Sequence, residues 1–231
     1  IKYGSVIAPP SVINIASDGT IIRVQGIAVD DWAGSAVGSG DFNGQGVDND
    51  VIIGAYSVGS NNGAVYIKLG DITGTFNLDD PNIITFTGFG AGHQAGWSAA
   101  AGKIDGDSID DLIIGAPFAG TVRGEVYVFY TPPGGYLGGE TVTLSAADIT
   151  FRGVGISDGA GTGVTVGDYD SDGLDDIVIG VYAEGINDYG KTYIFYNKDL
   201  ASHGASPIIV NTAEVEIIGP VSFDESGKSL A

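Results

Sequence analysis

Five aspartates crowd the segment "DYDSDGLDD" at residues 168–176, directly before an apolar run. Carboxylates at this spacing repel one another unless a cation lies among them or water screens them fully. Gly173 can adopt the left-handed conformation that a curled loop needs, so the alternating carboxylates can converge. An oxygen-only cage of this kind suits calcium better than zinc or copper. The predicted ligands are Asp168, Asp170, Asp172, the carbonyl of Leu174 and Asp176. The alternative is a solvated, Asp-rich turn without metal.

A second candidate cage lies near the start of the chain, in "DFNGQGVDND" at residues 41–50. Its neutral amide oxygens carry less charge than carboxylates, so we expect weaker calcium binding here than in the later loop. Asp50 is the expected closing ligand, with Asp48 as the rival. The predicted ligands are Asp41, Asn43, Gln45, the carbonyl of Val47 and Asp50.

The middle copy, "KIDGDSIDD" at residues 103–111, breaks the pattern. Lys103 occupies the first ligand position, while Asp105, Asp107 and Asp111 remain. An ammonium close to three carboxylates can neutralise them without a metal, so we expect Lys103 to replace calcium in this loop. The alternative is that Lys103 points into solvent and calcium binds the remaining carboxylates.

These three loops belong to an internal repeat with a fixed register. Each loop start, at residues 41, 103 and 168, is preceded by one glycine 15 positions upstream and another 7 positions upstream. The glycine pairs are Gly26 and Gly34, Gly88 and Gly96, Gly153 and Gly161, and, in a fourth copy without its loop, Gly219 and Gly227.

Each repeat of 62–66 residues contains short strand-like segments and no convincing helical periodicity. An apolar run follows each loop ("VIIGA", "LIIGA", "IVIGV"). An alternating strand comes next ("GAVYIK", "GEVYVF", "GKTYIF"), and a further strand closes the unit near "ITFTG", "ITFRG" and "VEIIG". Four short strands per repeat, with each sheet burying its faces on its neighbours, predict an all-β fold of β-propeller type.

The loops with their following strands resemble FG-GAP repeats, the blades of integrin α-subunit propellers and of many bacterial surface proteins. The segments are "GDFNGQGVDNDVIIGA", "GKIDGDSIDDLIIGAP" and "GDYDSDGLDDIVIG". The resemblance implies that each loop joins the first two strands of a four-stranded antiparallel blade and commonly holds calcium. Only "GAP" at 115–117 completes the family's Gly-Ala-Pro signature, which is degenerate in the other two copies.

The register predicts one propeller fragment over residues 1–231. It divides into a partial blade at 1–32, blades at 33–95, 96–160 and 161–226, and the start of another blade at 227–231. A strand is expected at 4–8 ("GSVIA"). Since propellers close with about four to eight blades, we expect an open arc that belongs to a larger ring, with the end blades lacking an intramolecular neighbour.

Composition restricts the partners. The 231 residues carry 29 Asp and Glu against 9 Lys and Arg, a net charge of −20, which argues against nucleic acid and against an anionic membrane surface. No apolar run approaches the ~20 residues that span a bilayer, so no membrane insertion is expected. The expected partners are a protein or glycan ligand at the cell surface, or neighbouring subunits of an assembly.

No residue set predicts catalysis. His93 and His203 lie far apart in sequence, and the acidic loops account for the recurrent carboxylates. Trp32 and Trp97 precede first strands, where we expect packing between blades rather than ligand stacking. The predicted function is therefore a non-catalytic, extracellular, calcium-stabilised scaffold for adhesion, recognition or surface assembly. The alternatives are the accessory propeller of a secreted hydrolase or lyase, and a carbohydrate-binding lectin, which would need aromatic-lined pockets between blades.

Overall fold

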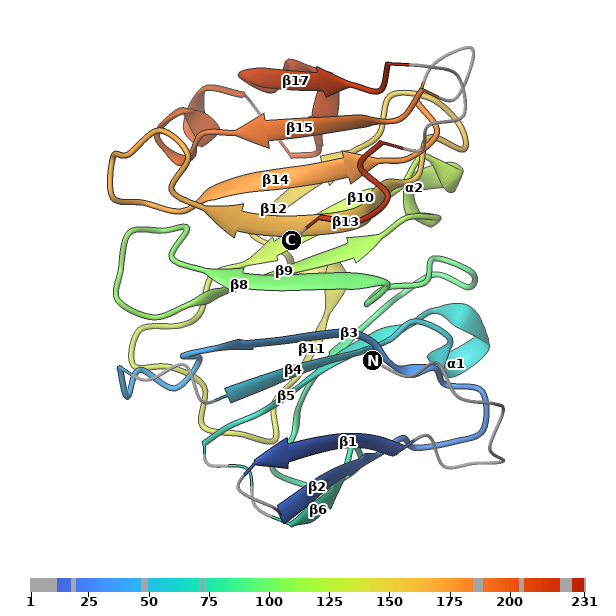
Figure 1. Cartoon of the computed structure of the whole chain (residues 1–231), viewed down its shortest axis with the longest axis vertical. Helices are drawn as coiled ribbons and strands as arrows, with labels where there is room; N and C mark the ends of the chain where they lie inside the picture. The colour runs from blue at the N-terminus through green and yellow to red at the C-terminus, as the bar shows by residue number, and fades with distance from the viewer. Residues whose placement is uncertain are drawn as a thin grey trace.

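The computed structural model describes residues 12–17, 20–46, 50–70, 72, 74–184, 189–203, 206–220 and 226–230. These residues form four twisted sheets stacked in a row, as Figure 1 shows. The all-β arc of propeller blades expected from the sequence is confirmed. The strand expected at residues 4–8 lies outside the described residues.

The four sheets follow the order of the repeats along the chain. The first sheet holds β1 (Val12–Ser17), β2 (Thr20–Gln25) and β6 (Thr75–Asn77). The second holds β3 (Ala33–Gly40), β4 (Asp50–Ala55), β5 (Ala64–Lys68), β7 (Ile84–Thr87) and β11 (Thr141–Thr143). The third holds β8 (Ser98–Gly102), β9 (Asp111–Ala116), β10 (Glu125–Phe129), β12 (Ile149–Arg152) and β16 (Ile208–Ile209). The fourth holds β13 (Ala160–Gly167), β14 (Asp176–Val181), β15 (Lys191–Phe195) and β17 (Val215–Ile218).

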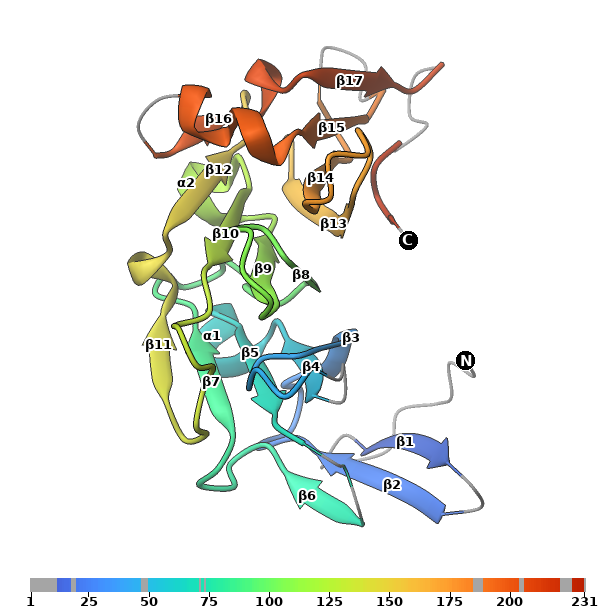
Figure 2. The same ribbon diagram turned by 90° about the vertical axis from the view of Figure 1, so that its left-hand side faces the viewer.

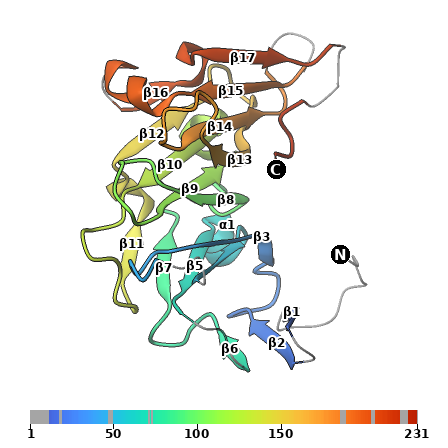
Figure 3. The ribbon, with the colours of Figure 1, turned by 60° about the vertical axis from the view of Figure 1, so that its left-hand side comes forward.

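The row of sheets is curved. Figures 2 and 3 show the first strands β3, β8 and β13 along one side and the outer strands β7, β11 and β12 along the other. The first and fourth sheets lie at opposite ends of the row, so the described residues form an arc and do not close a ring. In a propeller the first strands of the blades face the central axis, and this arrangement matches that geometry.

The sheets differ from the expected four-stranded blades in one respect. A short outer strand from each following repeat pairs in parallel with the last strand of the preceding blade: β6 with β2, β11 with β7, and β16 with β12. The other described strand pairs are antiparallel. The segment between the third and fourth strands of one repeat therefore covers the outer edge of the previous sheet, which would otherwise expose unpaired backbone groups.

Single helical turns and 3₁₀ turns join the strands. The turns α1 (Val58–Asn61) and α2 (Ala119–Val122) connect the second and third strands of two blades. The 3₁₀ segments are η1 (Leu144–Ala146), η2 (Asn197–His203) and η3 (Val210–Thr212).

Apolar side chains fill the spaces between sheets. Ile52, Val65 and Phe86 of the second sheet pack with Leu112, Ile114 and Tyr127 of the third. A similar cluster joins the third and fourth sheets, and its rings Phe151 and Phe195 have centroids 4.5 Å apart. The second and third sheets are covered on both faces, and their second strands β4 and β9 accordingly read as continuous apolar runs.

The repeating glycines mark the closest approach between blades. In three of the four register pairs the downstream glycine lies over a strand glycine of the preceding sheet: Gly96 over Gly54, Gly161 over Gly115 and Gly227 over Gly180. At each strand glycine an added Cβ would lie well inside 3.0 Å of a carbonyl oxygen, a separation that real Cβ atoms essentially never show. Side chains are therefore excluded at this seam, which explains why the sequence repeats glycine there.

Candidate functional site

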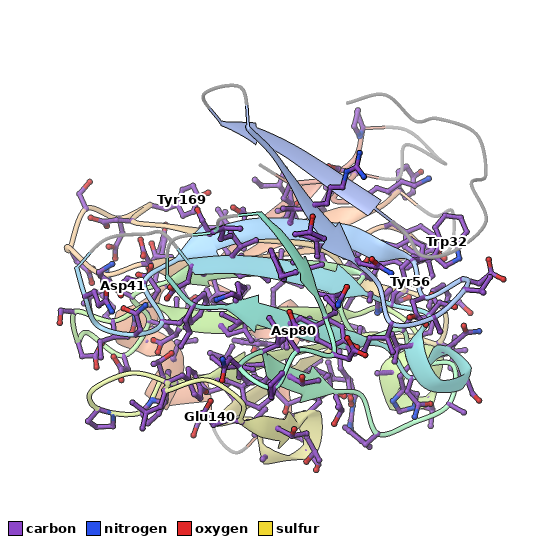
Figure 4. All side chains as sticks on the ribbon, turned by 90° about the horizontal axis from the view of Figure 1, so that it is seen from below. Trp32, Asp41, Tyr56, Asp80, Glu140 and Tyr169 are labelled. Atoms are coloured by element: carbon purple, nitrogen blue, oxygen red, sulfur yellow. The ribbon has the colours of Figure 1, made fainter. Side chains whose placement is uncertain are left out.

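The three acidic loops lie at one end of the strands, along one side of the arc. They connect the first and second strands of their blades, β3 to β4, β8 to β9 and β13 to β14. Figure 4 shows Asp41 and Tyr169, from the first and third loops, at one side of the molecule, and Trp32 and Tyr56 at the opposite side. The loops therefore form one acidic end, and the aromatic residues belong to the other.

The third loop brings three carboxylates together. Asp168, Asp170 and Asp176 each offer an oxygen, and these oxygens all lie within 4.8 Å of one another. The backbone curls as predicted, because Gly173 has a φ of 92° and Ser171 a φ of 64°. The N–H groups of Asp172 and Gly173 donate to the carboxylate of Asp168 at 3.0 Å each. The loop thus aims its acidic side chains inward.

The predicted ligand Asp172 lies outside that group of three carboxylates. The carboxylate of Asp172 accepts the N–H of Leu174 at 2.9 Å.

An ammonium approaches the cluster from η2, since Lys198 Nζ forms an ion pair with Asp170. Hydrogen bonding to Asp170 raises the pKa of Lys198. In this structure a lysine thus partly neutralises the three carboxylates.

The last aspartate of each loop ties two segments to its strand. One oxygen of Asp176 accepts the N–H of Tyr169 at 2.8 Å, and the other accepts that of Asn197 at 2.9 Å. Asp50 and Asp111 make the matching bonds in their blades. The donors are the N–H groups of Phe42 and Gly70 for Asp50, and of Ile104 and Thr131 for Asp111. The closing position therefore has a structural role in all three loops, whether or not metal is bound.

The residue before the closing aspartate bridges neighbouring blades, a role that sequence reasoning missed. Asp110 accepts the N–H of Asp41 at 2.8 Å and returns its own N–H to the Asp41 carbonyl at 2.9 Å. Asp175 makes the same pair of bonds with Lys103, at 2.8 and 3.3 Å. The doubled aspartates in "DD" at 110–111 and 175–176 were the available signal. In each pair the first aspartate bonds to the preceding blade, and the second aspartate closes the loop of its own blade.

The first loop is curled in the same way, with less charge. Asp41 is 2% exposed and accepts the N–H groups of Gln45 and Gly46. Asn43 uses its side-chain oxygen for the N–H of Gln45 and its side-chain nitrogen for Asp50. The predicted Val47 carbonyl and the rival ligand Asp48 lie outside the described residues.

The second loop adds a partner for Lys103 that the sequence did not suggest. Its ammonium lies 2.5 Å from Asp110, a carboxylate of the bridging position. Two other carboxylates of this loop form local turns. The carboxylate of Asp105 accepts the backbone N–H of Asp107, and the carboxylate of Asp107 accepts the backbone N–H of Ile109. Lys103 therefore neutralises the inter-blade link. The physical reason is that Asp110 already lies against the backbone of the first loop and is 5% exposed.

Burial is the largest influence on the pKa of two closing aspartates, Asp50 and Asp111. Desolvation raises the pKa of Asp111 from 3.8 to about 6, against the lowering effect of its backbone hydrogen bonds. Burial likewise raises the pKa of Asp50 above its ordinary value. A nearby cation would oppose this cost, because it favours the charged form.

The opposite end carries a row of aromatic rings. Trp32 stacks on Tyr56 with centroids 5.7 Å apart, Tyr56 lies 4.8 Å from Trp97, and Trp97 lies 6.1 Å from Phe118. Trp32 is 59% exposed. Only the contact between Tyr56 and Trp97 joins two successive sheets, whereas Trp32 stacks on Tyr56 of the sheet that it precedes. The sequence did not reveal that these rings form one continuous row.

Neither histidine joins an acidic loop. His93 lies in the turn after Gly92 and packs edge-on against Phe89, with centroids 5.5 Å apart. His203 ends η2. Among the described residues no helix is long and apolar enough to cross a membrane.

Two segments of the chain match a known repeat family. A family model for the FG-GAP repeat matches residues 95–129 and 160–195. Phosphatidylinositol-glycan-specific phospholipase D of Homo sapiens is 39% identical over 127 residues, covering 52% of this chain and 15% of that protein. The Dictyostelium discoideum protein of the same name is 26% identical over 220 residues, covering 86% and 23%. Integrin alpha-PS2 of Drosophila melanogaster is 29% identical over 177 residues, covering 74% and 12%. The chain thus spans a minor part of each relative.

Proposed function

Because the chain carries FG-GAP repeats, we propose that it is a non-catalytic, extracellular propeller scaffold. In this proposal calcium stabilises the acidic end, and the scaffold serves adhesion, recognition or surface assembly. The single observation that carries the proposal is the third loop, where oxygens of Asp168, Asp170 and Asp176 lie within 4.8 Å of one another. The similarity to an integrin alpha chain supports a role in recognition at a cell surface.

The three loops should differ in calcium affinity. The third offers three converging carboxylates, and calcium would have to displace the Lys198 ammonium from Asp170. The first replaces carboxylates by Asn43 and Gln45, so its affinity should be lower. In the second, Lys103 already neutralises Asp110, and we propose that this loop binds no metal.

The test is calcium titration of the purified chain by calorimetry, combined with melting curves in calcium and in chelator. Asp170→Asn should abolish the strongest binding event and most of the calcium-dependent rise in melting temperature. Asp105→Asn is the matched control, because Asp105 holds the same loop position and accepts the equivalent N–H, that of Asp107. Equal losses in both variants, or a melting curve indifferent to chelator, would contradict the proposal.

A second candidate function follows from the phospholipase relatives. The chain is 39% identical to a part of the human enzyme, so we also propose that it can serve as an accessory propeller of a secreted hydrolase. Reading the coding sequence on both sides of this segment tests that candidate. An adjoining catalytic domain would favour it, whereas further propeller repeats leading to an adhesion protein would favour the first proposal.

A further inference from the structure

An open groove lies between the second and third sheets, away from the acidic loops. It has a volume of about 330 Å³ and is lined by Phe89 from the loop after β7, by Glu125 and Tyr127 of β10, and by Thr150 and Arg152 of β12. Ser206, from the segment before β16, completes the polar wall. Four chain segments distant in sequence therefore converge on this groove.

The polar wall of the groove is preorganised. Glu125 is 4% exposed, and its Oε1 accepts Nε of Arg152 at 2.7 Å and Nη2 at 2.6 Å, while its other oxygen accepts the hydroxyl of Tyr127. An arginine has five N–H donors in a fixed planar fork. Glu125 holds one edge of this fork, and among the described residues the Nη1 donors of Arg152 have no partner, so they remain for a ligand.

An aromatic ring, that of Phe89, also lines the groove beside Tyr127. Phe89 is 53% exposed, although its ring makes T-shaped contacts with the rings of His93 and Tyr127 at centroid distances of 5.5 and 6.2 Å. These neighbours fix the ring from two sides and leave apolar surface open. An exposed ring held in place by its neighbours, together with polar side chains that are already oriented by hydrogen bonds, is typical of sites that bind ligands with one apolar and one polar side.

Only the groove between the second and third sheets has this combination among the seams that the structure describes. At the next seam Lys191 stands at the position of Glu125, and Val154 at that of Phe89. Lys191 is paired there with Glu184 and Glu216. One seam earlier the equivalent positions hold Ala64 and Ile27. The combination of Phe89 and Glu125 is therefore specific to this seam and does not follow from the repeat alone.

We propose that this groove binds a neutral saccharide, with one pyranose ring stacked on Phe89 and its hydroxyls bonded to Arg152. The apolar C–H face of a pyranose suits the ring, and its hydroxyls can accept from the guanidinium. Glu125 neutralises Arg152, and the chain carries a net charge of −20, so sulfated or carboxylated sugars are disfavoured. The inference rests on the proposed recognition function and names its ligand class.

The experiment measures binding of the methyl glycosides of glucose, galactose, mannose and N-acetylglucosamine by ligand-observed NMR and calorimetry, in calcium. Glucuronic and sialic acid serve as acidic comparison probes. Phe89→Ala should weaken binding of the preferred neutral sugar about tenfold, the scale of one aromatic contact. Phe89→Trp should retain binding. Leu137→Ala is the matched control, since Leu137 is 89% exposed and lies outside the groove.

Each outcome decides the question. Binding of a neutral sugar that Phe89→Ala loses, and that Phe89→Trp and Leu137→Ala keep, supports the saccharide site. No binding of any neutral probe at millimolar concentration, binding of acidic probes alone, or equal loss in the Leu137 control overturns it. Calcium-dependent melting is recorded on the same samples. An intact calcium response without sugar binding overturns only the saccharide site, whereas an absent calcium response contradicts the scaffold proposal separately.

Discussion

Replacing Gly115 by alanine should destabilise the chain by opening the seam between the third and fourth sheets. Gly115 lies in β9 directly beneath the carbonyl of Gly161, and an added Cβ would also meet Oγ of Ser98 well inside 3.0 Å. The same oxygen of Gly161 accepts the Ser98 hydroxyl at 2.8 Å. The backbone of Gly161 cannot rotate away as the end of a flexible side chain would. The two blades must therefore separate, and the Ser98 bond must weaken.

The cost follows from two contributions. Overpacking a tight contact costs about 1–3 kcal/mol, and loss of a hydrogen bond adds about 1 kcal/mol. The expected fall in the free energy of unfolding is therefore about 3 kcal/mol. For a domain of this size each kcal/mol corresponds to roughly 2–4 °C in melting temperature. Gly115→Ala should thus melt about 6–12 °C below the parent chain.

Thermal unfolding followed by circular dichroism, with urea unfolding as a second measurement, tests this expectation. Gly38→Ala is the matched control, because Gly38 also lies in a strand but its nearest atom to an added Cβ, Ile52 Cδ1, is at 3.4 Å. The control should stay within about 0.5 kcal/mol of the parent or gain slightly from lower chain entropy. If Gly115→Ala melts like the control, the seam is not the close contact described above.

Two further predictions concern charge. Burial raises the pKa of Asp111 from 3.8 to about 6, so the folded state binds the proton of this carboxyl group more strongly than the unfolded state does. The contribution of protonated Asp111 to the free energy of unfolding is therefore fully present below about pH 4 and is lost as the pH rises through about 6. With both proteins in chelator, the free energy of unfolding of the parent chain should fall by up to about 3 kcal/mol relative to that of Asp111→Asn between these pH values. If urea unfolding shows the same difference between the two proteins at both pH values, the raised pKa is contradicted. Lys103→Ala should lower stability in chelator by about 1 kcal/mol, because it leaves the buried Asp110 without its ammonium, whose own side chain is 43% exposed. An unchanged melting temperature would count against the internal cation.

The architecture could be predicted from the sequence because each propeller blade repeats the same local pattern of glycines, loop and short strands. The glycines at fixed distances from each loop lie where backbone passes over backbone, so their identity is dictated by the seam itself, as at Gly161 over Gly115. The curl of the third loop was likewise local, since Gly173 and the alternating aspartates are neighbours in the chain. Local spacing could therefore predict the blades and the convergence of Asp168 with Asp170.

What the sequence could not predict depends on pairings between repeats. The outer strands β6 and β11 are 3 residues each, too short for any periodicity, and they exist only because the preceding blade offers an edge. The partner of Lys103 is set by the register of two neighbouring loops. The groove joins Phe89 to Arg152 and Ser206, residues that no spacing rule connects. Non-local contacts of this kind leave no periodic trace.

The consecutive aspartates explain how a cation in one loop could act beyond it. Calcium held by Asp168, Asp170 and Asp176 would fix Asp176, which also holds the backbone of Asn197 after the third strand. The adjoining Asp175 is bonded to both backbone groups of Lys103 in the preceding blade. A cation would therefore stiffen the third strand of its own blade and the loop of its neighbour through bonds already present. Stability in a repeat protein is approximately the sum of repeat and interface contributions, so neutralising one loop should strengthen a seam as well as a blade.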